Sequence, residues 1–472
     1  MRKLILATAL FGSICTANAQ DPAGNAFHID YDQFQIDNVL HYINCGNDAS
    51  FNVGANMTME LWLRPYSTAW NQKLAGKLNG NFNSGYMMAI DQGKLYPEIW
   101  TPGQSQLLSG FLPPTPTPYY WVHLAITYDG SNLTAYVNGE EVGQTNASGA
   151  VASNNDPFII GIAPWDLSNF QAFGDFDELR VWNTARTQQE LLDNMFVQLT
   201  GSETGLVAYY DFNVDTGTNL PDLSPNGNDG TVTGTMAVSG WEPSRAVIGD
   251  AAMSTQNDIN ALWNALAFSD PRFVTTTNGL SLLASGIPDY DYIVFGHDSG
   301  SGVSTADNPA GAPADFEHSG RSWYLNNVGG FASDMIFDLT NVADGGTVLD
   351  ATQPAENYTL LHRTGTSGAY TAVGSGNSIS GNIVTFSSQL AADGYYAIGV
   401  ASTQTYNDAS LLEKQDFEFG LYPNPADDQL TIQLPTVLSG QLEIFNAVGQ
   451  LVLTQELEKV VNQTVNICLL YT

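Results

Sequence analysis

The segment that most constrains the fold is WVHLAITYDGSNLTAYVNGEEV, residues 121–142. Alternate residues in its first half fall on opposite faces of an extended strand. One face carries Val122, Leu124 and Ile126, and the other Trp121, His123, Ala125 and Thr127. Asp129-Gly130 and Asn138-Gly139 are turn dipeptides on either side of a β-prone run at 133–137. The segment therefore predicts antiparallel hairpins and an all-β fold.

The order W-x-H-x-A-x-T-Y-D-G, followed by L-x-x-Y-V-N-G, resembles the laminin-G-like jelly-roll family of the concanavalin-A-like lectin superfamily. FGDFDELRVWNTART (residues 173–187) is similar to the closing strand of that family, and GLVAYYDFN (205–213) to its last strand. Further strands are expected at 57–63 and 87–90, and Thr187 with Glu190 predicts a capped helix that ends at Met195. The resemblance implies a β-sandwich over residues 25–245 that serves as a binding module.

The N-terminus predicts a secretory signal peptide over residues 1–19. Arg2-Lys3 precedes an apolar run at 4–15, and Ala17-Asn18-Ala19 is an A-x-A site that predicts cleavage after Ala19. Cleavage removes two of 14 basic residues, which leaves 12 against 48 acidic ones and a net charge of −36. This acidic excess argues against nucleic acid and anionic membranes as partners. No later run approaches the ~20 apolar residues of a transmembrane segment, so none is predicted.

Residues 250–402 predict a second, smaller β-sandwich with one helix. Ile259, Leu262, Trp263 and Leu266 recur at helical spacing, and Pro271 ends that pattern. Strand-like runs follow, separated by Gly, Asn and Ser, at residues 290–296, 333–339, 358–362, 383–386 and 395–400.

Residues 403–419 predict a polar linker, and residues 420–472 resemble the C-terminal sorting domain of the type IX secretion system. The resemblance rests on LYPNPADDQLTIQLP and on the strand pair 441–445 and 450–454. It implies the type IX secretion machinery as a partner and an extracellular or outer-surface location. The ending VNICLLYT departs from the family pattern, so we expect an incomplete domain, residues beyond about 458 poorly ordered, and an open sheet edge.

Carboxylates near the predicted closing strand could serve glycoside hydrolysis or calcium binding. The E-x-D-x-x-E pattern of jelly-roll glycoside hydrolases is missing; Asp175 and Asp177 would share a strand face while Glu178 points away. The resemblance places Asp30 and Asp177 on flanking segments, and calcium prefers such oxygen ligands, so a calcium site at Asp30 and Asp177 is expected. Alternatively, Asp177 and Glu178 only pair with Arg180 or cap a turn.

Exposed aromatic residues are the expected basis of sugar binding. Trp62, Trp121 and Trp182 match core positions of the family, whereas Trp70, Trp100 and Trp165 lie in loop-like segments. These last three are the candidate ligand-binding residues, although a loop tryptophan can also plug the edge of a core. His297 and His318 lie among acidic residues and suggest a metal site, or are simply solvated.

Together these features predict a secreted or cell-surface, non-catalytic protein that binds carbohydrate or mediates adhesion through its laminin-G-like module. Its partner would be a glycan or another cell-surface ligand, with calcium as a structural cofactor. The alternatives are a divergent glycoside hydrolase of the same superfamily and a structural surface spacer.

Overall fold

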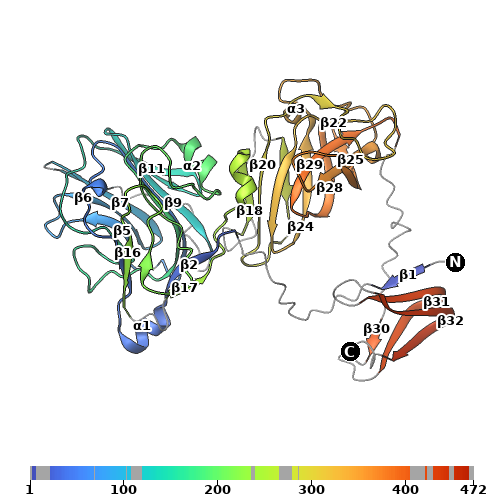
Figure 1. The fold of residues 1–472 in the computed structure, drawn as a ribbon, viewed down its shortest axis with the longest axis horizontal. Coiled ribbons are helices and arrows are strands. Elements are labelled where there is room, and N and C mark those ends of the chain that lie inside the picture. The colour runs from blue at the N-terminus through green and yellow to red at the C-terminus, as the bar shows by residue number, and fades with distance from the viewer. Residues whose placement is uncertain are drawn as a thin grey trace. The chain divides into compact units, whose positions relative to one another are not determined.

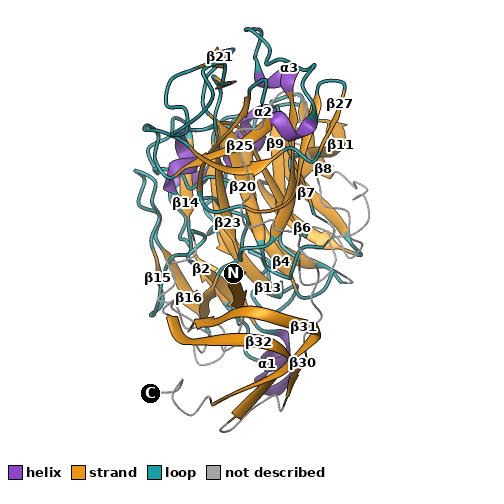
Figure 2. Ribbon diagram, turned by 90° about the vertical axis from the view of Figure 1, so that its right-hand side faces the viewer, coloured by secondary structure: helices purple, strands orange, loops and turns teal. Residues whose placement is uncertain are grey.

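The computed structural model describes residues 3–6, 22–68, 70–102, 104–107, 120–234, 240–264, 279–284, 286–403, 420–422, 429–445 and 451–466. Strands dominate these ranges and the helices are short (Figure 2). The chain forms two compact units, one of Gln20–Asn407 and one that combines Met1–Ala19 with Asp408–Thr472. No helix in the described ranges is long and apolar enough to cross a membrane.

Two antiparallel sheets form a jelly roll in the first half of the larger unit (Figure 1). The β4 sheet has the order β11-β10-β9-β4-β13-β2-β17, with β14 also paired to β13. Its strands are β2 Asn25–Ile29, β4 Met57–Pro65, β9 Val122–Tyr128, β10 Asn132–Val137, β11 Glu140–Asn146, β13 Gly174–Trp182, β14 Leu206–Tyr210 and β17 Gly240–Pro243.

The β5 sheet lies opposite it in the order β15-β16-β3-β12-β5-β6-β7-β8. Its strands are β3 Tyr42–Asn44, β5 Gln72–Leu78, β6 Gly85–Asp91, β7 Lys94–Thr101, β8 Gln104–Leu107, β12 Ile159–Ile160, β15 Asn219–Leu220 and β16 Gly230–Thr233. Short helices α1 Tyr31–Asp37, η1 Ala49–Phe51 and α2 Gln188–Asn194 connect strands.

The hairpin predicted from residues 121–142 is confirmed. β9 pairs with β10 from Tyr128↔Leu133 to Leu124↔Val137. Asn138 and Gly139 have φ angles of 50° and 76°, as a tight two-residue hairpin turn of the NG type requires. Val122, Leu124 and Ile126 lie in the core between the two sheets, so the predicted alternation of faces is also correct.

The other face of the β4 sheet is covered by α2 and by the second sandwich. The predicted capping box of α2 is present, with Thr187 and Glu190 bonded reciprocally and Met195 as the C-cap. Trp62, Trp121 and Trp182 are buried as expected. However, Trp62 and Trp121 do not lie between the two jelly-roll sheets, because they pack with Phe196 and Trp263 where the two sandwiches meet.

The second sandwich also consists of two sheets. The β20 sheet has the order β18-β20-β23-β29-β22-β21, with β25 paired to β26 and β29, and the β24 sheet has the order β19-β24-β28-β27. Their strands are β18 Asn257–Trp263, β19 Leu280–Leu283, β20 Tyr292–His297, β21 Val303–Ser304, β22 Glu317–Ser319, β23 Trp323–Val328, β24 Ala332–Asp338, β25 Tyr358–Arg363, β26 Thr371–Ser375, β27 Ser378–Ser380, β28 Ile383–Leu390 and β29 Gly394–Val400. The remaining short helices are η2 Ala251–Thr255, α3 Leu339–Val342 and η3 Ala355–Asn357.

The predicted strands of this sandwich are all found, but the helix predicted from Ile259 onward is wrong over residues 257–263. These residues form β18, which pairs with β20. Ile259, Ala261 and Trp263 contact the apolar cluster between the sandwiches, whereas Leu262 faces the core of the second sandwich. The last three residues of β18, 261–263, are apolar and all buried, and a short apolar run of this kind cannot be distinguished from a helix by periodicity alone.

The smaller unit contains a sheet built on β31 Gln429–Phe445, which pairs with β30 Gly420–Tyr422, β32 Leu451–Asn466 and, in parallel, β1 Lys3–Leu6. The predicted strand pair of the sorting domain is therefore confirmed. The expectation of poor order beyond about residue 458 is wrong as far as Asn466, because β32 continues to that residue and pairs there with Gln429. Residues 467–472 lie outside the described residues. Most of the predicted linker, residues 404–419, lies outside the described residues.

Candidate functional site

Three aromatic side chains gather on loops beside the β5 sheet; we call Phe82, Trp165 and Phe170 the aromatic platform. The ring centroids of Phe82 and Trp165 are 5.0 Å apart, and those of Trp165 and Phe170 6.3 Å apart. Phe82 and Phe170 are each 41% exposed, and Trp165 is half-buried. A group of large rings at the surface of a soluble domain is uncommon and often marks a binding surface.

The backbone at the two phenylalanines is strained. Phe82 has a φ of 49° and Phe170 a φ of 62°, in the left-handed region that non-glycine residues rarely adopt. Such a conformation costs of order 1 kcal/mol or more, and it persists only where the surrounding structure imposes it. Both exposed rings of the platform therefore occupy positions that glycine would fill at lower conformational cost.

Lys73 on β5 supports the platform from the sheet. Its Nζ lies 5.6 Å from the ring centroid of Trp165 and 5.7 Å from that of Phe170, within the range of cation–π attraction. Burial lowers the pKa of Lys73, although the charges of Glu98 and Asp91 oppose this effect. The ammonium group thus holds two rings in place and leaves their outer faces to solvent.

Polar side chains border the platform. Asn79 Nδ2 donates to Asn83 Oδ1 at 2.8 Å in the loop that carries Phe82. Asn169 Nδ2 donates to Asp166 Oδ2 at 2.8 Å, and Ser168 also donates to Asp166, in the loop that carries Phe170. These hydrogen bonds lower the pKa of Asp166, which is partly exposed. The rings are thereby accompanied by exposed amide and carboxylate groups that can bond hydroxyls.

The structure separates the three predicted tryptophans. Only Trp165 belongs to the platform. Trp70 is 39% exposed and packs against Tyr31, with ring centroids 5.4 Å apart, in a second patch that includes Tyr66. Trp100 lies on β7, half-buried, and its Nε1 donates to Glu98 at 2.7 Å.

Sequence reasoning missed Phe82, Phe170 and Lys73. Phe82 stands in NGNFNSG and Phe170 in LSNFQ, where an aromatic residue is surrounded by turn-forming residues. An aromatic residue in such a turn is a sequence signal for an exposed ring. The position of Lys73 beneath the rings depends on the packing of loops far apart in sequence and had no sequence signal.

The family motifs instead build a buried charge network, which we define as Glu60, His123, Glu178 and Arg180. All four are at most 1% exposed. His123 Nε2 lies 3.2 Å from Glu60 Oε2, and Arg180 Nη2 donates to Glu178 Oε2 at 2.6 Å. Arg180 also donates to the carbonyls of Asn194 and Val197. The network thus fixes the segment after α2, which packs against the second sandwich.

A β-bulge explains how Glu178 joins this network. The register of β13 against β4 shifts between Asp177 and Arg180, and Glu178 has a φ of 51°. The extra residue turns Glu178 to the side of Arg180, where Tyr209 also donates to it at 2.9 Å. The expectation that Glu178 points away from its acidic neighbours was wrong for this reason, while its alternative pairing with Arg180 is correct.

Burial and the neighbouring charges shift the pKa values of the network residues. Burial lowers the pKa of His123 below its ordinary value, although Glu60 opposes this effect. Burial alone would raise the pKa of Glu60, but the hydrogen bond from His123 and the charge of Arg180 lower it. Arg180 has a raised pKa despite its burial, because Glu178 and Glu60 stabilise its charge. Burial raises the pKa of Glu178, although Arg180 opposes this effect. The network is therefore a structural element sealed from solvent.

The two residues expected to bind calcium are not brought together. Phe176 pairs with Phe27 across the two strands. The next residue, Asp177, therefore lies beside Ala26, which is four residues away from Asp30 along the chain. That spacing corresponds to about 13 Å. Asp177 is buried and accepts a hydrogen bond from Ser244, and burial together with the charge of Glu178 raises its pKa well above the ordinary value. Calcium binding stays a prediction.

The histidines considered as metal ligands are both buried rather than solvated. His318 Nδ1 lies 2.7 Å from the Ser319 carbonyl oxygen, and its Nε2 lies 2.6 Å from that of Ala306. His297 contacts the Asp298 carbonyl through Nδ1 and Asp258 Oδ2 through Nε2 at 3.0 Å. Each ring nitrogen already has a partner, and the two histidines do not form a common group.

Comparison with known families agrees with the motifs. Residues 38–192 match the family model described as the Concanavalin A-like lectin/glucanases superfamily, in its laminin-G form. Residues 420–470 match the model described as the Secretion system C-terminal sorting domain. The chain therefore contains a laminin-G-like jelly roll followed at its C-terminus by a sorting domain of the type IX secretion system, which indicates export.

Individual similarities are limited to parts of the chain. Human pappalysin-1 is 31% identical over 91 residues, which are 19% of this chain and 6% of that protein. A Bacteroides ovatus protein to which carbohydrate binding is ascribed is 23% identical, with a TM-score of 0.36, over 48% of this chain and 61% of that one. The CBM40 of a Ruminococcus gnavus sialidase, bound to α2,3-sialyllactose, is 13% identical, with a TM-score of 0.28, over 36% of this chain and 97% of that one. The chain spans less than two thirds of either of the first two proteins.

Proposed function

We propose that this chain is an exported, non-catalytic glycan-binding protein whose jelly roll holds a sugar on the aromatic platform. The observation that carries the proposal is the exposure of Phe82 and Phe170 on either side of Trp165, with strained backbones at both phenylalanines. A pyranose ring has apolar C–H faces and hydroxyl edges. Flat aromatic rings pack against the former, and neighbouring amides and carboxylates bond the latter.

The polar groups around the platform suit a neutral or weakly charged polysaccharide. Asn83, Asp166 and Asn169 present amide and carboxylate groups in the loops that carry the rings. The chain as a whole has a net charge of −34, which would repel a strongly acidic glycan. A polysaccharide with several sugar units in a row fits an open platform better than a small ligand that needs an enclosed pocket.

Export through a cleaved signal peptide and the type IX machinery would place this platform outside the cell. The proposed cleavage after Ala19 leaves the jelly roll intact, because β2 begins at Asn25. An ancillary polysaccharide-binding protein or an adhesin is the role that such a location favours.

The carboxylates favour this proposal over a hydrolase. Asp175 is held by both Arg64 and His28, and Asp177 is buried against Ser244. Neither is free to act as an acid or a nucleophile on a glycosidic bond, which needs two accessible carboxyl groups facing a cleft. The exposed platform in turn favours a binder over a structural spacer.

The test is a glycan array on the intact chain, with polysaccharide hydrolysis measured in parallel. We expect binding to one class of glycan and no release of reducing sugar. Trp165→Ala should remove binding, whereas Leu223→Ala, which truncates a side chain that is 42% exposed elsewhere on the jelly roll, should not. Turnover of the bound glycan would instead support the hydrolase, and the absence of any bound glycan would support the spacer.

A further inference from the structure

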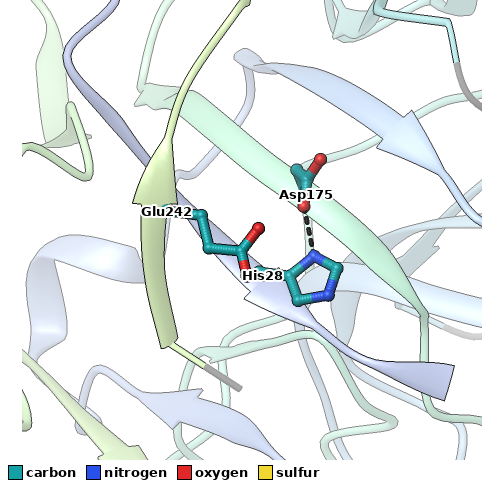
Figure 3. A group of neighbouring side chains, drawn as sticks. All are labelled: His28, Asp175 and Glu242. Carbon is teal, nitrogen blue, oxygen red and sulfur yellow. Dashed lines mark hydrogen bonds and ion pairs between the residues drawn. The ribbon is translucent and has the colours of Figure 1, made fainter. Parts of the chain in front are cut away.

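A second group of side chains, separate from the platform, lies on the β4 sheet. His28 on β2, Asp175 on β13 and Glu242 on β17 come from three adjacent strands and point toward one another (Figure 3). One donor atom from each residue lies within 4.8 Å of the other two. We call these three residues the His28 cluster.

The register of the strands explains why the cluster forms. His28 pairs directly with Asp175 on one side and with Gly240 on the other. Gly240 has no side chain, so Glu242, two residues further along the same face of β17, can reach diagonally toward His28. Strands in a paired sheet are rigid supports, and the donors are therefore held close together by the fold itself.

The donor set identifies the class of ion that fits. An imidazole nitrogen with two carboxylate oxygens is the combination that zinc and similar first-row transition metals accept, whereas calcium takes oxygen ligands. From these contacts we propose that His28, Asp175 and Glu242 bind a divalent transition metal ion, with zinc as the representative.

The surroundings of the cluster suit a bound cation. Burial alone would lower the pKa of His28, but Asp175, Glu242 and Asp30 raise it, so the imidazole lies in an acidic environment that favours a cation. Arg64 also contacts the cluster, since its Nε donates to Asp175 Oδ2. Asp175 Oδ1, which contacts His28 Nδ1 at 2.5 Å, is the oxygen that would turn to the metal.

The site also has a route to solvent and a structural consequence. Asp175 is buried, His28 is partly buried and Glu242 is exposed, so an ion can enter from the side of Glu242. β17 is the last strand at one edge of the β4 sheet and leads directly into the segment that joins the second sandwich. A metal ion at this position would cross-link β17 to β2 and β13.

The test uses Zn²⁺ and Co²⁺ alone with the intact chain. We expect one ion per chain by calorimetry, visible ligand-field absorption from Co²⁺, and a higher melting temperature with Zn²⁺ than with chelator. His28→Gln and Glu242→Gln should each weaken binding at least about tenfold, since loss of even an indirect ligand partner costs that much. Unchanged melting of both variants in chelator would show that they remain folded.

Two matched substitutions separate this site from diffuse binding. His362→Gln removes a histidine of the second sandwich, and Glu141→Gln removes an exposed acid of β11. Neither should change the affinity or the stoichiometry. The proposal is overturned if the chain binds no stoichiometric Zn²⁺, if His28→Gln and Glu242→Gln bind it as well as the wild type, or if all four variants lose affinity equally.

Discussion

The β4 sheet carries two groups that combine a histidine with carboxylates, and the groups differ mainly in what covers them. In the buried charge network, His123, Glu60 and Arg180 lie under α2 and the second sandwich and are at most 1% exposed. In the His28 cluster, a histidine and two carboxylates lie toward the edge of the sheet, with Glu242 open to solvent. The residue types alone therefore do not distinguish a structural group from a ligand site. The difference depends on whether other elements of the fold bury the group.

This comparison extends to the family motifs. The residues that make the sequence resemble laminin-G-like domains, among them His123 and Arg180, are buried and hold the fold together. The aromatic residues proposed to bind a glycan lie outside those motifs, in loops. The family motifs consequently indicate the fold of the domain. The ligand depends on the residues exposed at its surface.

The largest effect is expected from breaking the buried charge network. Arg180→Met should lower the free energy of unfolding by about 3–5 kcal/mol, because it leaves Glu178 and Glu60 buried without their cation. Arg186→Met, which breaks a partly exposed pair with Glu190 at 3.8 Å, should cost less than about 1 kcal/mol. Chemical denaturation of both variants measures the difference, and equal losses would show that the network has no special structural role.

A comparable loss is expected where the second sandwich covers the β4 sheet. Trp263 is buried against Trp62 and Phe196, with ring centroids 6.0 and 5.6 Å away. Trp263→Ala should cost about 3–5 kcal/mol. It should also separate the unfolding of the two sandwiches, which we expect to unfold together in the wild type. Calorimetry that shows two transitions already in the wild type would contradict this coupling.

A smaller effect concerns pH. The folded state depresses the pKa of His123, so this residue contributes stability that is present above its unfolded pKa of about 6.5 and lost as the pH falls through its folded pKa. The stability of the wild type relative to His123→Gln should therefore decrease on acidification below about pH 6.5. Denaturation curves of both proteins across this range supply the comparison. A difference that is constant with pH would mean that His123 is protonated equally in both states.

Much of the fold followed from the sequence, because alternation and turn dipeptides are local. The hairpin at 121–142, the capped helix at Thr187 and the closing strand at 174–182 were predicted correctly. β18 was predicted as a helix, since its burial on both faces depends on a neighbouring sandwich that the sequence does not reveal. The turn of Glu178 toward Arg180 likewise depends on a bulge, which leaves no clear sequence pattern.

The candidate site was only partly predictable. Trp165 was identified from its loop, but Phe82 and Phe170 became partners only once distant loops were brought together around Lys73. The expected link between β2 and β13 was correct, although the residues that meet there are His28 and Asp175 rather than Asp30 and Asp177. A shift of two residues keeps the same strand face, so periodicity could not choose between the two pairs.

The most direct test of the division between a buried scaffold and an exposed binding surface is the substitution Phe170→Gly. Removing the ring should weaken binding to the glycan identified on the array at least about tenfold, or about 1.4 kcal/mol. The free energy of unfolding should stay the same or rise slightly, because glycine adopts a φ of 62° without strain. Calorimetric titration and chemical denaturation of the one variant measure both quantities. Unchanged glycan affinity would contradict the account, as would a loss of stability large enough to explain the loss of binding.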